Sequence, residues 1–291
     1  MGLSPSHKFG QIIGDVLEEA IEPLLRGFAQ DHGLYLDRKG PRTARKGKSV
    51  SWTDASGNKH DLDFVLEKGG TDSEIGTPVA FIETAWRRYT KHSRNKAQEI
   101  QGAILPLVTT HRHVAPFIGV ILAGVFTEGA LAQLRSLGFT AIYFPYETVI
   151  QAFRCAGIDA SFHEKTPDSA FAKKVRAWKR LPRRTQAAVP RSLLELNSGE
   201  VRAFMGDLKL AITRKVETVR ILPLHGTPRE MSSVQDAIAF IQTYDEGASS
   251  QPIVKYEVAV RYSNGDRIEA QFTDKGGAVQ FLRGLPVPPA G

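Results

Sequence analysis

The sequence predicts an α/β protein: a mixed sheet flanked by helices, followed by a smaller C-terminal α+β domain. Continuous apolar runs at residues 116–126 and 140–144 have the composition of strands buried on both faces. A helical segment at residues 127–137 separates them, and this strand–helix–strand order is typical of an α/β core. Farther along the chain, a repeated strand–turn–strand–helix pattern predicts the second domain.

The N-terminal part of the chain supplies the other expected elements of the core. Apolar residues recur at helical spacing over residues 6–30, within which Pro23 predicts a kink or a split. A helix capped by Ser93 is expected to run to about residue 107. Strand-like patterns occupy four further segments, of which the second and third read as a hairpin: residues 34–36, 49–53, 61–66 and 78–84.

The composition changes past about residue 161, which predicts a division of the chain. Residues 1–165 are expected to form the core, residues 166–200 a basic helix and linker, and residues 201–291 an accessory domain. The repeated units at residues 216–244 and 255–283 are each too small to bury an apolar face alone. We therefore expect them to pack together, in a domain that recognises DNA, joins two protomers or only adds stability.

The charge of the chain favours a polyanionic partner. The net charge is +7, and Lys and Arg gather in three blocks, at residues 38–48, 87–96 and 173–191. Such blocks neutralise phosphates and predict strongly salt-dependent binding to nucleic acid. The alternative for each block is a solvated basic loop.

Several classes of protein are excluded by what the sequence lacks. No apolar run reaches the roughly 18 residues of a membrane span, and the N-terminus lacks the pattern of a secretory signal. The single cysteine, Cys155, cannot form an intrachain disulfide, and a cytoplasmic location is expected. The sequence has no glycine-rich phosphate loop and no dinucleotide fingerprint, so no nucleotide cofactor is expected.

Acidic residues on two neighbouring strands are candidates for the chemistry. Alternation along the second hairpin strand places one set of side chains on a common face: Asp61, Asp63, Val65 and Glu67. Glu83 ends the next, buried strand, where a charged carboxylate is unfavourable unless it is paired or bound to metal. Two carboxylates on adjacent strands can hold Mg²⁺ or Mn²⁺ beside a phosphate. The alternative is an ordinary strand-end acid paired with a nearby arginine.

This arrangement resembles the PD-(D/E)XK nuclease superfamily. An Asp opens an apolar strand at Asp63, a Glu ends the next strand at Glu83, and a basic helix follows. The resemblance covers roughly residues 6–160 and implies a restriction-endonuclease-like fold. It also implies that Asp63 and Glu83 bind the metal and act in catalysis, joined by Glu18 or Glu19 of the first helix.

The sequence departs from the family at the third position of the motif, where Ala85 stands in place of the usual lysine. Three nearby residues could supply the missing cation, in this order of preference: Lys91, Arg88 and Arg87. Contacts to DNA are expected from seven basic side chains: Arg87, Arg88, Lys91, Arg94, Lys96, Lys173 and Lys174.

The resemblance implies a Mg²⁺-dependent endonuclease of the type II restriction kind, which hydrolyses phosphodiester bonds in double-stranded DNA. Cutting both strands usually takes two active sites, so a homodimer is expected. Two alternatives stay open. One is a nuclease-fold protein that lacks activity and serves as a DNA-binding or assembly module, and the other is a structure-specific DNA repair nuclease.

Overall fold

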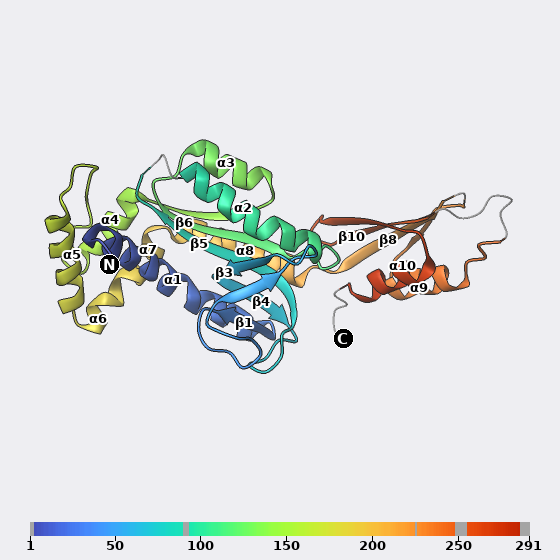
Figure 1. Ribbon diagram of the computed structural model, residues 1–291. Helices are drawn as coiled ribbons and strands as arrows, with labels where there is room; N and C mark the ends of the chain where they lie inside the picture. Colours follow the sequence, from blue (N-terminus) through green and yellow to red (C-terminus); the bar gives the residue numbers. More distant parts are fainter. Residues whose placement is uncertain (1–2, 90–92, 225, 248–254, 286–291) are drawn as a thin grey trace. The chain divides into compact units, whose positions relative to one another are not determined.

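The chain forms two compact units in the computed structural model (Figure 1). The first unit contains residues 1–109 and 117–207, and the second contains residues 110–116 and 208–291. The structure describes most of the chain, in four segments: residues 3–89, 93–224, 226–247 and 255–285. Helix α8 (Ser198–Thr213) contributes residues to both units, so the boundary differs from the one expected at residue 201.

The segment expected as a basic helix and linker belongs to the first unit. It forms three helices, α5 (Asp168–Arg180), α6 (Arg183–Gln186) and α7 (Ala188–Leu196). Besides their basic residues, these helices carry apolar side chains that are buried: Phe171, Val175, Val189 and Leu193. The ring of Phe171 lies 6.1 Å from that of Phe9 in helix α1 (Pro5–Asp31), which ties this segment to the core.

A five-stranded mixed sheet forms the centre of the first unit, which confirms the predicted α/β class. The two parallel pairings involve the last three strands, and the other pairings are antiparallel. In spatial order the strands are β1 (Leu34–Arg38), β4 (Phe64–Lys68), β5 (Thr77–Arg87), β6 (Phe117–Gly124) and β7 (Thr140–Pro145). Every residue of β6 is buried, as the continuous apolar run predicts.

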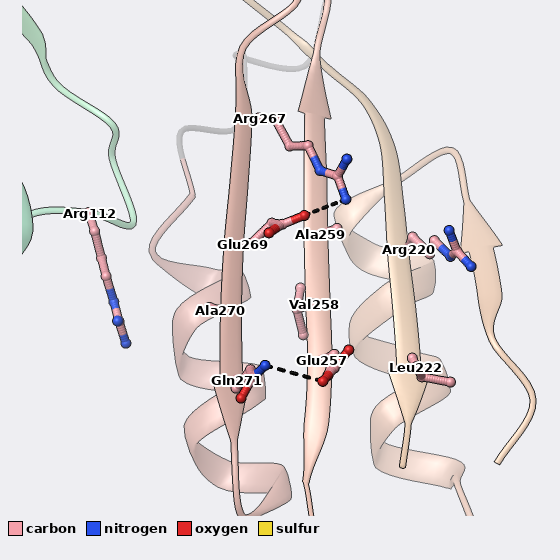
Figure 2. A pocket seen from close by; sticks show the side chains of 10 residues that line it. All are labelled: Arg112, Arg220, Leu222, Glu257, Val258, Ala259, Arg267, Glu269, Ala270 and Gln271. Atoms are coloured by element: carbon pink, nitrogen blue, oxygen red, sulfur yellow. Dashed lines mark hydrogen bonds and ion pairs between the residues drawn. The ribbon is translucent and has the colours of Figure 1, made fainter. Parts of the chain in front are cut away.

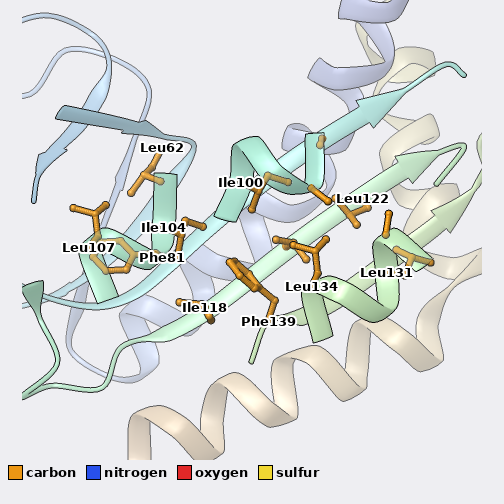
Figure 3. Close-up of a cluster of buried hydrophobic side chains, with 14 of the residues drawn as sticks. Leu62, Phe81, Ile100, Ile104, Leu107, Ile118, Leu122, Leu131, Leu134 and Phe139 are labelled. Atoms are coloured by element: carbon orange, nitrogen blue, oxygen red, sulfur yellow. The ribbon is translucent and has the colours of Figure 1, made fainter. Parts of the chain in front are cut away.

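Helices lie on both faces of this sheet. On one face, α2 (Ser93–Thr110) and α3 (Glu128–Ser136) share an apolar core with the strands (Figure 3). Phe81 and Ala85 of β5 belong to this core, so the alternation along the strand places Glu83 on the face that α2 covers. On the other face, α1 contacts β1 and β5.

Among the described residues, every helix is too short or too polar to span a bilayer.

Helix α1 runs without a break through Pro23, so the expected split is wrong. Proline removes one hydrogen bond from the helix interior and crowds the preceding turn. The side chain of Pro23 is exposed, and water can therefore reach the carbonyl that loses its donor. The buried residues on both sides of Pro23, from Phe9 to Ala29, keep the helix packed along its length.

The acidic strand of the hairpin is divided at Asp63. β3 (Lys59–Leu62) pairs with β2 (Val50–Thr53) in a separate two-stranded sheet, and β4 begins at Phe64. The predicted hairpin therefore forms, but a single strand over residues 61–66 is wrong. Asp63 lies in the bend between β3 and β4.

Glu67 is expected to share a face with Asp61 and Asp63, but it is fully buried in an ion-pair network. The register of β4 against β5 shifts between Leu66 and Glu67. Arg42 donates to both carboxylate oxygens of Glu67, at 2.6 and 3.0 Å, and lies 2.9 Å from Asp37. Arg42 also donates to the carbonyl oxygens of Thr71 and Glu74. The network thereby joins the loop after β1 to the loop after β4.

Replacing Arg42 with Met is expected to lower the free energy of unfolding by about 3–5 kcal/mol, because it leaves a buried carboxylate without its cation. Chemical denaturation measures this change. The matched control is Arg38→Met, since Arg38 is 48% exposed and pairs with Glu22 at the surface. That control should cost less than about 1 kcal/mol. Equal effects of the two substitutions would contradict the structural role of the network.

The second unit confirms the predicted duplication. Each repeat supplies two strands and a helix: β8 (Val216–Pro223), β9 (Arg229–Met231) and α9 (Val234–Thr243), then β10 (Tyr256–Tyr262), β11 (Arg267–Phe272) and α10 (Lys275–Arg283). The strands form one antiparallel sheet in the order β11–β10–β8–β9, and its apolar side chains share a core with both helices. The face away from the helices carries mixed charges, including Arg220, Glu257, Arg267 and Glu269 (Figure 2).

Candidate active site

Asp63 and Glu83 lie side by side at one end of the β4–β5 pair. Phe64 is the partner of Ile82 across these antiparallel strands, so the next positions outward are Asp63 and Glu83. The backbone N–H of Asp63 donates a hydrogen bond to the Glu83 carboxylate. The backbone N–H and the hydroxyl of Thr84 each donate to Oδ2 of Asp63 at 2.7 Å. Thr84 thus fixes the Asp63 carboxylate beside Glu83.

The Glu83 carboxylate is largely withdrawn from water. Its side chain is 13% exposed, and its Oε2 atom is buried without a hydrogen-bond partner among the described residues. Burial and, to a smaller extent, the negative charge of Asp63 raise the pKa of Glu83 to about 8, against the opposing effect of Lys96. A buried acid with an unused oxygen is suited to bind a proton or a metal ion.

The structure distinguishes Glu18 from Glu19, which the sequence alone does not. Glu18 is half-buried on α1, where burial and then the charges of Asp63 and Asp15 raise its pKa to about 7. The charge of Glu18 also adds to the rise in the pKa of Glu83. Glu19 is exposed. Glu18 is therefore the third acid of the group, which we call the acidic cluster: Glu18, Asp63 and Glu83.

The basic partner of this cluster comes from α2. Lys96 Nζ lies 3.8 Å from Oε1 of Glu83 and 3.5 Å from Oε2 of Glu99. The Lys96 side chain is 18% exposed, so its cation is held mostly out of water next to a buried acid. From the sequence, Lys96 is expected only as a DNA contact. Among the described residues, Lys96 is the basic side chain that forms an ion pair with Glu83, the position expected for the basic residue of the site.

The three residues preferred from the sequence for that role lie elsewhere or outside the described part of the chain. Lys91 falls outside the described residues. Strand β5 continues to Arg87, which puts Arg87 on the Glu83 face, but its guanidinium lies 3.4 Å from the Glu99 carboxylate. Arg88 lies over the ring of Tyr89 at 4.4 Å, with two further phenylalanine rings nearby. Neither arginine is ion-paired with Glu83 in the described structure.

The remaining predicted DNA contacts differ in how free they are. Arg94 at the start of α2 and Lys173 on α5 are exposed. Lys174 is held at Asp159, where its Nζ donates to the backbone carbonyl and lies 3.5 Å from the carboxylate. Arg94 and Lys173 therefore remain the better candidates for phosphate contacts.

Sequence reasoning does not predict Thr84 as part of the site, and it predicts Lys96 as a DNA contact rather than as the ion-pair partner of Glu83. A signal for Lys96 exists: it lies three residues after Ser93 and four before Ile100, on the side of α2 that is buried. A lysine in such a stripe needs an acid or a polar cavity. No comparable signal marks Thr84, because its role depends on the bend at Asp63 that separates β3 from β4.

The donor set of the acidic cluster fits a hard divalent cation. Within the described part of the chain, no three His, Cys, Asp or Glu side chains converge closely enough to form a metal site by themselves. Mg²⁺, however, commonly binds through one or two carboxylates and keeps several waters. Asp63 and Glu83 provide such a pair, and the unpartnered Oε2 of Glu83 leaves one buried oxygen for it.

Metal binding at this cluster is expected to strengthen as the pH rises from 6 to 8. Below its pKa of about 8, Glu83 carries a proton that a metal ion must displace. Near pH 7, binding should therefore release about one proton, and affinity should rise up to about tenfold per pH unit. Calorimetry with Mn²⁺ in buffers of different ionisation enthalpy measures the released proton. An affinity that does not change with pH over this range would contradict ligation by Glu83.

Comparisons with known proteins leave the family of this chain open. No protein-family model matches the sequence, and no curated protein matches it. A solved structure of a protein of unknown function, AF1548, is similar to 66% of this chain and 99% of its own, with 9% identity and a TM-score of 0.28. So low a score carries no argument about fold or function.

Proposed function

We propose that this protein is a metal-dependent endonuclease that hydrolyses phosphodiester bonds in double-stranded DNA, with restriction-type activity. The observation that supports this most strongly is the Asp63–Glu83 pair with Lys96 beside it. A structural acid would normally satisfy both of its oxygens, whereas Glu83 keeps one buried oxygen without a partner among the described residues. The order of helices and strands in the first unit is also compatible with a restriction-endonuclease-like core.

Each residue of the site has a chemical role in this proposal. Asp63, fixed by Thr84, and Glu83 would hold Mg²⁺, which would supply a Lewis acid and lower the pKa of a bound water. Lys96 would offset the negative charge that develops on the scissile phosphate. Glu18, with its pKa of about 7, is suited to take up a proton from the attacking water at neutral pH.

The basic character of the protein supports DNA as the substrate. The chain has a net charge of +7, and exposed cations such as Arg94 and Lys173 belong to the first unit, as the acidic cluster does. These cations would bind backbone phosphates and release counterions, so affinity should fall steeply with salt. Cutting both strands would require two copies of the site, which favours a homodimer.

Digestion of plasmid and phage DNA, methylated and unmethylated, tests the proposal directly. With Mg²⁺ or Mn²⁺ we expect discrete fragments, and sequencing of their ends would give the recognition site. Chelation of the metal should stop cleavage, as should Asp63→Ala and Glu83→Ala. Cleavage that survives both substitutions would refute the assignment. Salt-dependent DNA binding without any product would favour a DNA-binding or assembly module instead.

A further inference from the structure

A cavity of about 600 Å³ in the first unit is connected to the acidic cluster through the ion pairs of Lys96. The beginning of α1, the end of β5 and the first turns of α2 line it. Glu99 is part of its wall and lies 3.5 Å from Lys96, which in turn lies 3.8 Å from Glu83. Two ion-pair contacts therefore separate a wall residue of this cavity from the Glu83 carboxylate.

The principal cation in the wall is Arg88, which aromatic rings hold in place. Its guanidinium lies over Tyr89 at 4.4 Å, Phe171 at 5.3 Å and Phe162 at 5.6 Å. No carboxylate of the described residues forms an ion pair with it. Stacking uses the face of the guanidinium and leaves the N–H groups at its edge for another acceptor. Two oxygens of one phosphate can accept hydrogen bonds from two neighbouring N–H groups of this edge.

Aromatic and amide groups complete the wall. The indole of Trp86 is fixed by Tyr146 and Phe162, at ring distances of 6.2 and 6.4 Å. It lies against α1 at Gly10, where an added Cβ would be 3.6 Å from its Nε1 atom. Side-chain amides of Gln11 and Asn95 also line the cavity. The wall therefore combines a phosphate-binding cation with surfaces for stacking and hydrogen bonding to a base.

We propose that this cavity receives one unpaired nucleotide of the strand that is cut, with its phosphate on Arg88 and its base against the aromatic wall. This inference rests on the proposed function and names the part of the substrate that the site selects. The volume lies within the usual range for small-ligand sites, about 300–1,000 Å³. The cavity is open to solvent on one side. A base that stays paired and stacked has both faces covered by its neighbours, so only an unpaired base can turn a face towards the aromatic wall.

Binding of two short DNA duplexes to the full-length protein tests the inference. One duplex is fully paired, and the other carries a single unpaired nucleotide. Fluorescence anisotropy is measured in EDTA, so that hydrolysis does not interfere. We expect the unpaired nucleotide to strengthen binding by about 5- to 150-fold, the range of one stacked base. An abasic residue at the unpaired position should remove most of this preference.

Two substitutions at Gly10 provide a matched pair. Gly10→Ala adds a methyl group at an ordinary contact distance from Trp86, so the preference should remain. Gly10→Leu extends a side chain into the cavity and should abolish the preference without removing any residue of the acidic cluster. Arg88→Ala should also abolish it, whereas Arg135→Ala, at an exposed position on α3, should leave it unchanged.

Equal binding of the two duplexes by the wild type would overturn the inference, as would a preference that survives both Gly10→Leu and Arg88→Ala. These outcomes are separate from the proposed function, because binding is read without cleavage. Metal-dependent cleavage with no preference for the unpaired nucleotide would leave the nuclease proposal standing and remove the cavity assignment. A preference without cleavage under any metal would support the cavity as a nucleotide site and remove the nuclease.

Discussion

Glu83→Gln is expected to lower the rate of DNA cleavage by about 10³-fold or more, because metal ligation stabilises the transition state by several kcal/mol. The same substitution should make the metal-free protein more stable at alkaline pH. The pKa of Glu83 is raised to about 8, so in the folded chain this acid stays protonated up to a much higher pH than in the unfolded chain. Its stabilising effect is complete below about pH 4.5 and is lost as the pH rises towards 8.

Chemical denaturation at pH 5 and pH 8.5 in EDTA measures the second effect. At pH 8.5 the Gln variant should be more stable than the wild type by on the order of 2–4 kcal/mol, and at pH 5 the two should be similar. Mg²⁺ should stabilise the wild type and leave the variant unchanged. The control is Glu99→Gln, since Glu99 also lies near Lys96 but is 59% exposed. Destabilisation by Glu83→Gln at pH 8.5 would mean that Glu83 is a structural ion-pair partner.

The parts of the fold that the sequence predicts well are those that local patterns determine. The apolar run of β6 and the repeated units of the second domain carry their periodicity within a few residues. The bend at Asp63 has no local sequence signal, because the alternation of side chains continues from Asp61 to Glu67. The strands separate there because β3 pairs with β2 and β4 pairs with β5. Pairing partners far apart in sequence decide where a strand ends.

The candidate site shows the same limit. Asp63 and Glu83 are recognisable because Asp63 precedes an apolar strand and Glu83 lies towards the end of another, which continues to Arg87; the register brings the two acids together. The role of Glu67 is not recognisable, because its partner Arg42 lies in a loop 25 residues earlier. In both cases the sequence shows an acid at the end of an apolar run, which makes it look like a ligand. The difference between them is burial with an oxygen left unused, as in Glu83, against burial with every oxygen bonded, as in Glu67.

Lys96→Met is expected to lower the rate of cleavage by about 10²- to 10⁴-fold, the range of a positioned acid–base or charge-stabilising group. Lys96 lies 3.8 Å from Glu83 and is mostly buried, so its cation acts on the same few atoms as the acidic cluster. DNA affinity should change little, because Lys96 would be one of several phosphate contacts. Its loss should lower the slope of the salt dependence by only about one. Single-turnover cleavage together with anisotropy separates the two effects.

Two further variants, Lys96→Arg and Lys91→Met, test the catalytic role assigned to Lys96. Lys96→Arg keeps the positive charge but does not titrate, so substantial activity in that variant would indicate charge stabilisation, and its loss would indicate proton transfer. Lys91→Met tests the residue that the sequence favours. If Lys96 is the basic residue of the site, Lys91→Met should affect mainly DNA binding and its salt dependence. A larger loss of the cleavage step in Lys91→Met than in Lys96→Met would return the catalytic role to Lys91 and leave Lys96 as the counter-ion of a buried acid.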